Sequence, residues 1–326
     1  MKTIRWGMIG CGDVTEVKSG PGFYKAENST LSAVMRRNGA LAKDYAERHK
    51  VPRWHTDADA IIKDPEIDAV YIATMTDTHH EYALRCAAAK KPIYCEKPMA
   101  MSYEQCCEMI GAAKANGVPL WVGYYRRALP RYLKVKELIE DGAIGDVRVV
   151  TSQVYSKLVD TKNPYFAWRT DPKQSGGGLF FEGACHTLDM LDFLFGPIVE
   201  VRGFASNKAR AYEGEDLVTT TYRFQSGVHG VGMWCYTTDR EYEMNEIVGS
   251  KGRIQYSTAA PGPLKLLRGE KVEDLGIVDP PHLHQPMIQS IVNEMNGKGH
   301  CPSTGESASR TAWVMEQVLG EFYQYN

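Results

Sequence analysis

The sequence lacks several features that mark large classes of proteins. Lysine and arginine number 38 against 40 aspartates and glutamates, so at a net charge of −2 no excess of positive charge is present for a nucleic-acid backbone. No stretch approaches the roughly 18 consecutive apolar residues of a transmembrane helix. Lys2 and Arg5 interrupt the N-terminal run at once, which is not typical of a signal peptide. We therefore expect a cytoplasmic protein that binds neither nucleic acid nor membranes.

The eight cysteines include no Cys-x-x-Cys pair. In a chain of this length without a signal peptide, this favours free thiols in a reducing compartment over a disulfide framework or a structural zinc site. The 326 residues suggest about two domains.

The two halves of the chain have different patterns. In the first half, apolar segments at 4–9, 31–35, 67–73, 92–95 and 120–123 alternate with helical segments at 40–49, 81–89 and 103–116, which predicts a parallel, doubly wound sheet. In the second half, longer strands are predicted at 147–155, 217–224, 228–236 and 243–248, with a hairpin turn at 225–227 and helices at 286–295 and 307–323. The fold class is therefore α/β: a Rossmann domain over 1–122 and an α+β domain with a mostly antiparallel sheet over 123–326. The C-terminal helix packing back on the first domain remains an alternative.

A glycine pair follows the first strand. Gly10 permits a tight turn and Gly12 permits close approach of a pyrophosphate to the backbone at the start of a helix, where Asp13 and Val14 are also expected to contact the cofactor. Thr15 stands at the third glycine position of the dinucleotide-binding pattern, so we expect helix and strand to pack less closely there. A plain turn is the alternative interpretation.

The end of the second strand indicates which dinucleotide is bound. An Asp or Glu there normally bonds the ribose 2′-hydroxyl of NAD, but the sequence has Arg36, Arg37 and Asn38. Two guanidinium groups suit a 2′-phosphate, which favours NADP(H) over NAD(H). A solvated arginine pair is the alternative.

Glu96-Lys97-Pro98 follows the fifth strand. A lysine at the carboxyl end of a parallel strand faces the crevice where ligands bind. Pro98 restricts Lys97 to an extended backbone and permits a cis peptide bond between them.

Several motifs together resemble the glucose–fructose oxidoreductase/inositol dehydrogenase/MocA (Gfo/Idh/MocA) family. They are 6–12 (WGMIGCG), 71–74 (YIAT) with His79, 96–98 (EKP), 122–127 (VGYYRR), 168–169 (WR) and 176–178 (GGG) leading to His186. The resemblance implies an NAD(P)-dependent oxidoreductase that acts on the CH–OH groups of sugars, polyols or keto-sugars. It also implies an open-faced sheet in the second domain, which binds substrate and forms homodimers or homotetramers.

The resemblance also implies roles for individual residues. Lys97 and His186 correspond to the catalytic pair, with His186 as general acid or base and Lys97 stabilising charge on the substrate oxygen. Glu182 stands four residues before His186, where the family usually has an aspartate, so its geometry toward substrate does not carry over directly. The remaining expected cofactor contacts are Thr74, Thr76, His79, Glu96, Trp168 and Arg169, and the expected substrate contacts are Tyr124, Arg127, Tyr155 and Asp189.

We expect no metal. Glu182, His186 and Asp189 are acceptable ligands, but no further residues stand at a recognisable ligand spacing. His282 and His284 lie among prolines, so they are interpreted as part of a loop with a capping or substrate-contacting role.

Two other functions are compatible with this fold. One is a redox-neutral glycoside hydrolase or lyase that retains NAD. The other is a non-catalytic dinucleotide-binding regulator, which would need neither Lys97 nor His186.

Overall fold

The computed structural model describes residues 1–259 and 262–324. The chain forms two compact units, and the first contains Met1–Leu129 together with Asp279–Ser309. The second contains Pro130–Val278 and the chain from Arg310 onwards. These units differ from a single division between residues 122 and 123, because the segment 279–309 returns to the first unit.

The first unit is built on a parallel six-stranded sheet in the order β3-β2-β1-β4-β5-β6. This arrangement confirms the predicted doubly wound sheet. The central strand β4 is buried along its whole length, as expected when both faces of a parallel sheet are covered. The strands are β1 (Ile4–Ile9), β2 (Ser29–Met35), β3 (Trp54–His55), β4 (Ala69–Ile72), β5 (Ile93–Cys95) and β6 (Leu120–Val122).

Local signals explain where several helices of the first unit begin and end. Asn38 caps α3 (Gly39–His49) by accepting from the Leu41 amide, and Ser102 caps α6 (Tyr103–Asn116) by accepting from the Gln105 amide. The helix expected directly after Gly12 is interrupted, because a new helix starts at a glycine–proline pair. The other helical segments are α1 (Asp13–Val17), α2 (Gly20–Lys25), α4 (Asp59–Ile62), η1 (Thr76–Thr78), α5 (His79–Ala88), η2 (Tyr125–Ala128) and α11 (Gln285–Met295).

The second unit contains an eight-stranded sheet in the order β14-β13-β12-β11-β7-β10-β9-β8. Among the described strands of this sheet, only β7 and β10 pair in parallel, so the sheet is mostly antiparallel as predicted. The predicted hairpin is confirmed: β9 and β10 pair antiparallel around Gly227, whose φ is +85°. The strands are β7 (Val147–Tyr155), β8 (Ile198–Ser206), β9 (Leu217–Phe224), β10 (His229–Cys235), β11 (Tyr242–Gly249), β12 (Arg253–Tyr256), β13 (Lys265–Arg268) and β14 (Lys271–Asp274).

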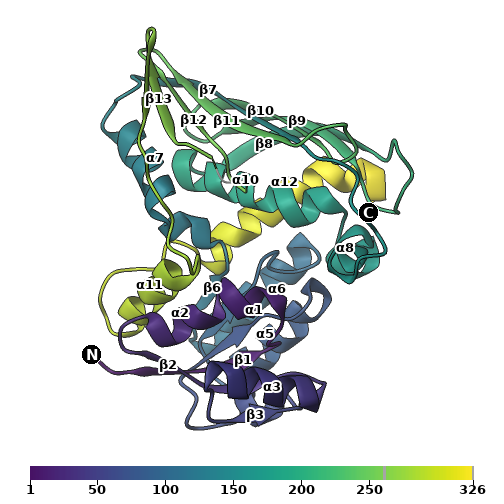
Figure 1. Ribbon diagram of the computed structural model, residues 1–326, viewed down its shortest axis with the longest axis vertical. Coiled ribbons are helices and arrows are strands. Elements are labelled where there is room, and N and C mark those ends of the chain that lie inside the picture. Colours follow the sequence, from purple (N-terminus) through teal and green to yellow (C-terminus); the bar gives the residue numbers. More distant parts are fainter. Residues whose placement is uncertain (260–261, 325–326) are drawn as a thin grey trace. The chain divides into compact units, whose positions relative to one another are not determined.

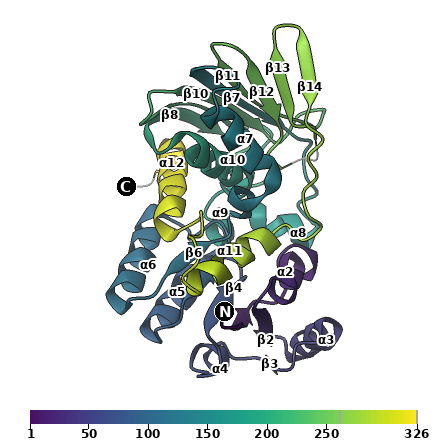
Figure 2. The same ribbon diagram turned by 90° about the vertical axis from the view of Figure 1, so that its left-hand side faces the viewer.

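One face of this sheet is covered by helices. Figures 1 and 2 show α10 (Leu179–Phe195) and α12 (Gly305–Tyr323) on the same side of the sheet. Arg310 of α12 donates to both carboxylate oxygens of Asp192 on α10, at 2.7 Å each, and Phe180 of α10 packs edge-on against Trp234 of β10. The remaining helices of the unit are α7 (Pro130–Glu140), α8 (Pro164–Ala167), η3 (Trp168–Thr170) and α9 (Pro172–Ser175). No helix within 1–259 and 262–324 is both long and apolar enough to cross a bilayer.

Candidate functional site

The glycine turn after β1 has the geometry of a backbone cradle. Gly10 has a φ of +93°, and a Cβ at that position would lie 2.8 Å from the Ala73 carbonyl, so only glycine fits without strain. Gly12 has an ordinary extended conformation, and a Cβ there would meet nothing closer than the Gly10 oxygen at 3.9 Å. The space in front of Gly12 is therefore open to an approaching ligand.

Thr15 fits at the third glycine position because its hydroxyl forms a hydrogen bond to the glycine turn. Its side chain is fully buried, and its hydroxyl donates to the Gly12 carbonyl at 2.7 Å. Gly20 at the start of α2 also packs closely on Thr15, since a Cβ there would lie 2.1 Å from the Thr15 oxygen. The Tyr45 hydroxyl donates to the same oxygen at 2.9 Å and fixes α3 against the turn.

The end of β2, which two arginines follow, lies beside this turn. The amides of Gly10 and Cys11 both donate to the Met35 carbonyl, at 2.8 and 3.2 Å. Arg36 is half-buried and donates to the Cys11 carbonyl at 3.2 Å, whereas Arg37 is exposed. The β2 end therefore places the Arg36 guanidinium next to the glycine turn, with the exposed Arg37 following it, and no carboxylate stands among residues 36–38.

The loop after β4 is tied to the Glu-Lys-Pro turn by His79. The His79 ring is buried, with Nδ1 2.9 Å from the Pro98 oxygen and Nε2 3.1 Å from the Thr74 oxygen. Thr74 accepts from the Thr78 hydroxyl at 2.8 Å, and Thr76 is buried at the start of η1. His79 thus links two loops that were predicted to contact the cofactor.

Glu96 is buried beneath the turn that carries Lys97. One Glu96 carboxylate oxygen accepts from the Lys97 amide at 3.2 Å, and the other accepts from the Tyr71 hydroxyl. Burial raises the pKa of Glu96, while the Tyr71 hydrogen bond and the Lys97 charge oppose that shift. The Lys97–Pro98 peptide bond is cis, and Lys97 is half-buried.

Two residues expected to contact substrate follow β6 in the first unit. Tyr124 is 1% exposed and precedes η2. Arg127 is 3% exposed and donates to the Pro302 carbonyl at 3.2 Å, so part of its hydrogen-bonding capacity serves the fold.

In the second unit, α10 brings Glu182, His186 and Asp189 together. Their spacing of four and three residues places them on one face of the helix. Glu182 and Asp189 are buried, and His186 is half-buried. The helix begins at Leu179, so Glu182 lies within its first turn.

Arg169 contacts Glu182, one of the two acidic residues of this group. Its guanidinium lies 3.7 Å from the Glu182 carboxylate and is stacked on the rings of Tyr165 at 3.8 Å and Trp168 at 4.2 Å. The aromatic contacts restrict the arginine to one orientation. The structure therefore joins Trp168 and Arg169, predicted to bind cofactor, to Glu182, predicted to be catalytic.

The start of α10 is fixed by Glu215, which sequence reasoning did not select. The fully buried Glu215 carboxylate accepts from the amides of Gly178 at 2.7 Å and Phe181 at 3.1 Å, and from the Tyr323 hydroxyl. A carboxylate at this position satisfies orphan amides and favours the positive end of the helix dipole. Because Glu215 follows Gly178 by 37 residues, no local sequence signal reveals this cap.

Tyr155 does not join the group on α10. Its ring stacks on Tyr242 and its hydroxyl lies 3.4 Å from the sulfur of Met233. Met233 is exposed, whereas the next residue, Trp234, packs against α10, so the alternation of side chains places Met233 and Tyr155 on the opposite face of the sheet. A direct role for Tyr155 beside His186 in the same chain is not supported by this placement.

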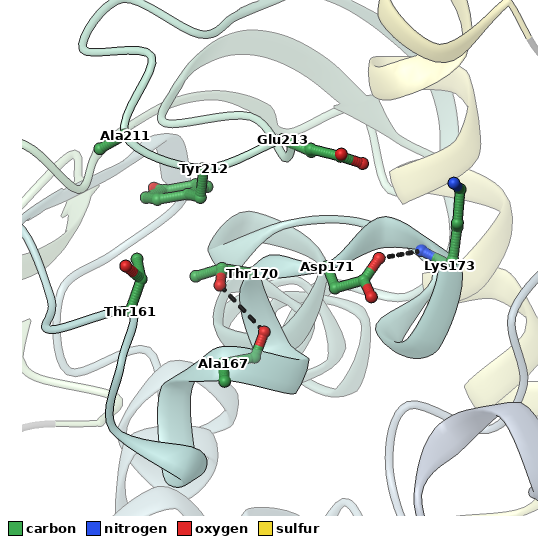
Figure 3. Close-up of a pocket in the computed structure, with 8 residues that line it drawn as sticks. All are labelled: Thr161, Ala167, Thr170, Asp171, Lys173, Ala211, Tyr212 and Glu213. Carbon is green, nitrogen blue, oxygen red and sulfur yellow. Dashed lines mark hydrogen bonds between the residues drawn. The ribbon is translucent and has the colours of Figure 1, made fainter.

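A separate hollow of about 320 Å³ lies close to the Trp168–Arg169 segment (Figure 3). Asp171 at its edge caps α9 by accepting from the Lys173 amide at 3.0 Å, and the Tyr212 ring forms part of the opposite wall. None of the residues selected from the sequence lines this hollow. Its lining is Thr161, Ala167, Thr170, Asp171, Lys173, Ala211, Tyr212 and Glu213.

His284 lies at the end of the loop before α11, as predicted, and occupies the N-cap position, but its side chain makes no capping hydrogen bond. It is fully buried within the first unit, its Nδ1 lies 2.9 Å from the Tyr94 hydroxyl, and its Nε2 lies 3.5 Å from Glu96. His282 points its Nδ1 at the Val17 carbonyl, 2.8 Å away. Across residues 1–259 and 262–324, no three His, Cys, Asp or Glu side chains are grouped so that they could hold a metal ion.

Two family models match the chain. Residues 4–124 match the model described as the oxidoreductase family with an NAD-binding Rossmann fold, and residues 132–255 match the GFO/IDH/MocA C-terminal domain. The first match lies within the first unit and the second within the second unit.

Individual proteins match over nearly the whole chain. Oxidoreductase P35 of Formosa agariphila is 36% identical over 321 residues, covering 97% of this chain and 98% of the relative. The 1,5-anhydro-D-fructose reductase of Ensifer adhaerens is 27% identical, covering 93% and 91%. Among solved structures, the aldose-aldose oxidoreductase of Caulobacter crescentus, complexed with glycerol, aligns with a TM-score of 0.88 at 24% identity, covering 100% of this chain and 99% of that one.

Proposed function

The chain belongs to the GFO/IDH/MocA family of oxidoreductases with an NAD-binding Rossmann fold, and from this premise we propose that it transfers hydride between NADP(H) and a sugar, polyol or keto-sugar. The observation that carries the proposal is the glycine turn. Gly10 requires its positive φ, and Gly12 leaves open space where a pyrophosphate would approach the backbone. The residues at this turn fit a dinucleotide.

A bound nicotinamide supplies the hydride chemistry, so the chain's own residues have to orient the substrate and move one proton. We assign the proton to His186, because an imidazole suits both the oxidative and the reductive direction. We assign to Lys97 the stabilisation of negative charge that develops on the substrate oxygen. Thr74, Thr76, His79 and Glu96 would shape the cofactor side of this site.

The Glu182 carboxylate has a cationic partner in Arg169. The 3.7 Å approach and the stacking of Arg169 on two aromatic rings give the longer glutamate side chain a fixed partner. We propose that Glu182, held this way, orients substrate or tunes His186, together with Asp189 one turn further along α10.

The preference for NADP(H) is tested by titration. We expect tighter binding of NADPH than NADH, because Arg36 lies beside the glycine turn, Arg37 follows it and no carboxylate stands among residues 36–38. Replacing both by alanine should weaken NADPH binding by roughly 10- to 100-fold, the value of one or two charge-assisted hydrogen bonds, and change NADH binding little. Arg202→Ala on β8 is the control. Tight NADH binding without measurable NADPH binding would overturn the assignment.

We further propose that the open face of the second unit's sheet forms a homodimer or homotetramer. Phe204 is 79% exposed on β8, and Val231 and Met233 are 44% and 39% exposed on β10. Phe204 and Met233 both lie opposite Thr219 of the intervening strand β9, so they occupy one row across the sheet. Thr219 separates these two side chains, and Val231 lies two residues before Met233 on the same face. Exposed apolar side chains gathered on one sheet face are typical of an interface, and Tyr155 would then lie in it.

We propose a cytoplasmic location because the cysteines are present as thiols, as is usual in a reducing compartment. All eight cysteines are thiols rather than disulfides, and six of them are buried. Burial raises the pKa of Cys11 to about 11, which keeps that thiol protonated and unreactive beside the glycine turn.

A further inference from the structure

A buried polar cluster lies beneath the Glu-Lys-Pro turn, and it involves a residue from the far end of the chain. Tyr71 on β4, Tyr94 on β5 and His284 ahead of α11 surround the Glu96 carboxylate. Tyr71, Tyr94 and His284 are essentially inaccessible to solvent, and Glu96 is 5% exposed. Polar groups buried so completely need fixed partners, so this cluster constrains the turn strongly.

The contacts of Glu96 explain why its position is narrowly defined. Its carboxylate accepts from the Lys97 amide and the Tyr71 hydroxyl. On another side, a Cβ on Gly123 would lie only 3.1 Å from the carboxylate, so Gly123 leaves the room that Glu96 occupies. His284 Nε2, 3.5 Å from the Tyr71-bonded oxygen, approaches the carboxylate from the remaining direction.

The state of the His284 ring follows from its surroundings. Burial, together with the charges of Lys18, Arg126 and Lys97, lowers the pKa of His284 to about 3, so the imidazole is neutral at physiological pH. A neutral imidazole has one donor and one acceptor nitrogen. The Tyr94 hydroxyl, 2.9 Å from Nδ1, can donate to that nitrogen, which leaves the proton on Nε2, the atom that faces Glu96.

We propose that His284 is a positioning residue for the reaction: its imidazole, oriented by Tyr94, directs Nε2 toward the Glu96 carboxylate 3.5 Å away, and this electrostatic contact helps to hold the carboxylate that fixes the Lys97 backbone. Glu96 presents Lys97 in one direction, and His284 keeps Glu96 in place. The inference rests on the proposed role of Lys97 in catalysis.

A second set of contacts could suggest that His284 only anchors its own segment. The His284 amide donates to the Lys18 carbonyl at 3.1 Å, and His282 reaches the Val17 carbonyl. Both contacts attach the segment before α11 to the end of α1. His282 does not touch Glu96, so His282→Ala is a matched control that loosens the anchor without removing the Nε2 contact.

The test compares His284→Leu, His284→Gln and His282→Ala in the full-length protein. We expect His284→Leu to lower kcat at least about 10-fold with dinucleotide Kd changed less than about 3-fold, the pattern of a contact that acts on the catalytic step rather than on cofactor binding. His284→Gln places an amide N–H near the Nε2 position and should restore kcat to within about 3-fold of wild type. His282→Ala should leave kcat within about 2-fold.

Hydrogen exchange provides a readout that does not depend on turnover. Exchange at the Lys97 amide should accelerate in His284→Leu and stay near the wild-type rate in His284→Gln and His282→Ala, because only the first variant releases Glu96. If the wild-type protein turns over no carbonyl or alcohol, the proposed function fails while the exchange result still decides this inference.

Should His284→Leu fail to fold, Tyr94→Phe takes its place. It removes one oxygen atom and releases the ring orientation, and we expect roughly a 3-fold loss of kcat that disappears in the His284→Gln background. Equal damage from His282→Ala and His284→Leu, or wild-type kcat and exchange in His284→Leu, would overturn the inference.

Discussion

Replacing glycine by alanine should have different consequences at the two positions of the glycine turn. At Gly12 the backbone conformation suits any residue and an added Cβ would lie 3.9 Å from its nearest neighbour. At Gly10 the φ of +93° and the 2.8 Å approach to Ala73 leave no room. Gly12→Ala should therefore disturb ligand binding, whereas Gly10→Ala should disturb folding.

The magnitudes follow from these contacts. Gly12→Ala should change the free energy of unfolding by less than about 0.5 kcal/mol, as for an unhindered surface position. Its methyl group would occupy the space of the pyrophosphate and cost one charge-assisted hydrogen bond, about 1.5–3 kcal/mol, or roughly 10- to 150-fold in dinucleotide Kd. Gly10→Ala should destabilise the fold by about 2–4 kcal/mol through left-handed backbone strain and the carbonyl contact.

Two assays separate these effects. Urea denaturation gives the free energy of unfolding, and titration of nicotinamide fluorescence gives the Kd for NADPH and NADH. Gly12→Ala protein that binds both dinucleotides like wild type would refute the assignment of this turn to the pyrophosphate. Wild-type stability in Gly10→Ala would refute the steric argument.

Three further predictions concern the cap, an ion pair and the sheet face. Glu215→Ala leaves two amides of α10 without their acceptor and should lower the free energy of unfolding by about 3–5 kcal/mol in urea denaturation, more than the isosteric Glu215→Gln, which keeps one oxygen. Arg48 lowers the pKa of Glu16 to about 2, so the ion pair stabilises the fold above pH 4.5 and is lost as pH falls toward 2. After screening, Glu16→Gln should cost about 0.5–1 kcal/mol at pH 7, and the difference from wild type should shrink below pH 4.5; a constant difference would contradict the linkage. Val231→Asp should reduce an oligomer to monomers in light scattering after gel filtration, without changing NADPH affinity, whereas an unchanged mass would place the interface elsewhere.

Much of the fold is predictable because its signals are local. The strand 217–224 is correct to the residue, and its hairpin partner, predicted at 228–236, is observed at 229–235, because a segment rich in β-branched and aromatic residues ends at a turn whose Gly adopts positive φ. The short strands β3, β12, β13 and β14 have two to four residues and show too little alternation to be recognised.

The remaining features depend on residues that are distant in sequence. The start of α10 is set by Glu215, 37 residues after Gly178, and His284 meets Tyr94 across 190 residues. The position of 279–309 in the first unit is likewise not predictable from the order of the elements along the chain. The sequence motifs identify Gly10, Gly12, Lys97 and His186 as candidates, but the residues that hold them in place become apparent only from the packed structure.

The most direct test of the central claim is nicotinamide absorbance during turnover by wild type and Lys97→Met, across a panel of sugars, polyols and keto-sugars, with Lys25→Met as the surface control. We predict NADPH oxidation or NADP⁺ reduction by wild type and by Lys25→Met. In Lys97→Met, turnover should fall at least about 100-fold while dinucleotide Kd stays within about 3-fold, as expected when a group acts mainly in the transition state. Unchanged turnover in Lys97→Met would contradict the account.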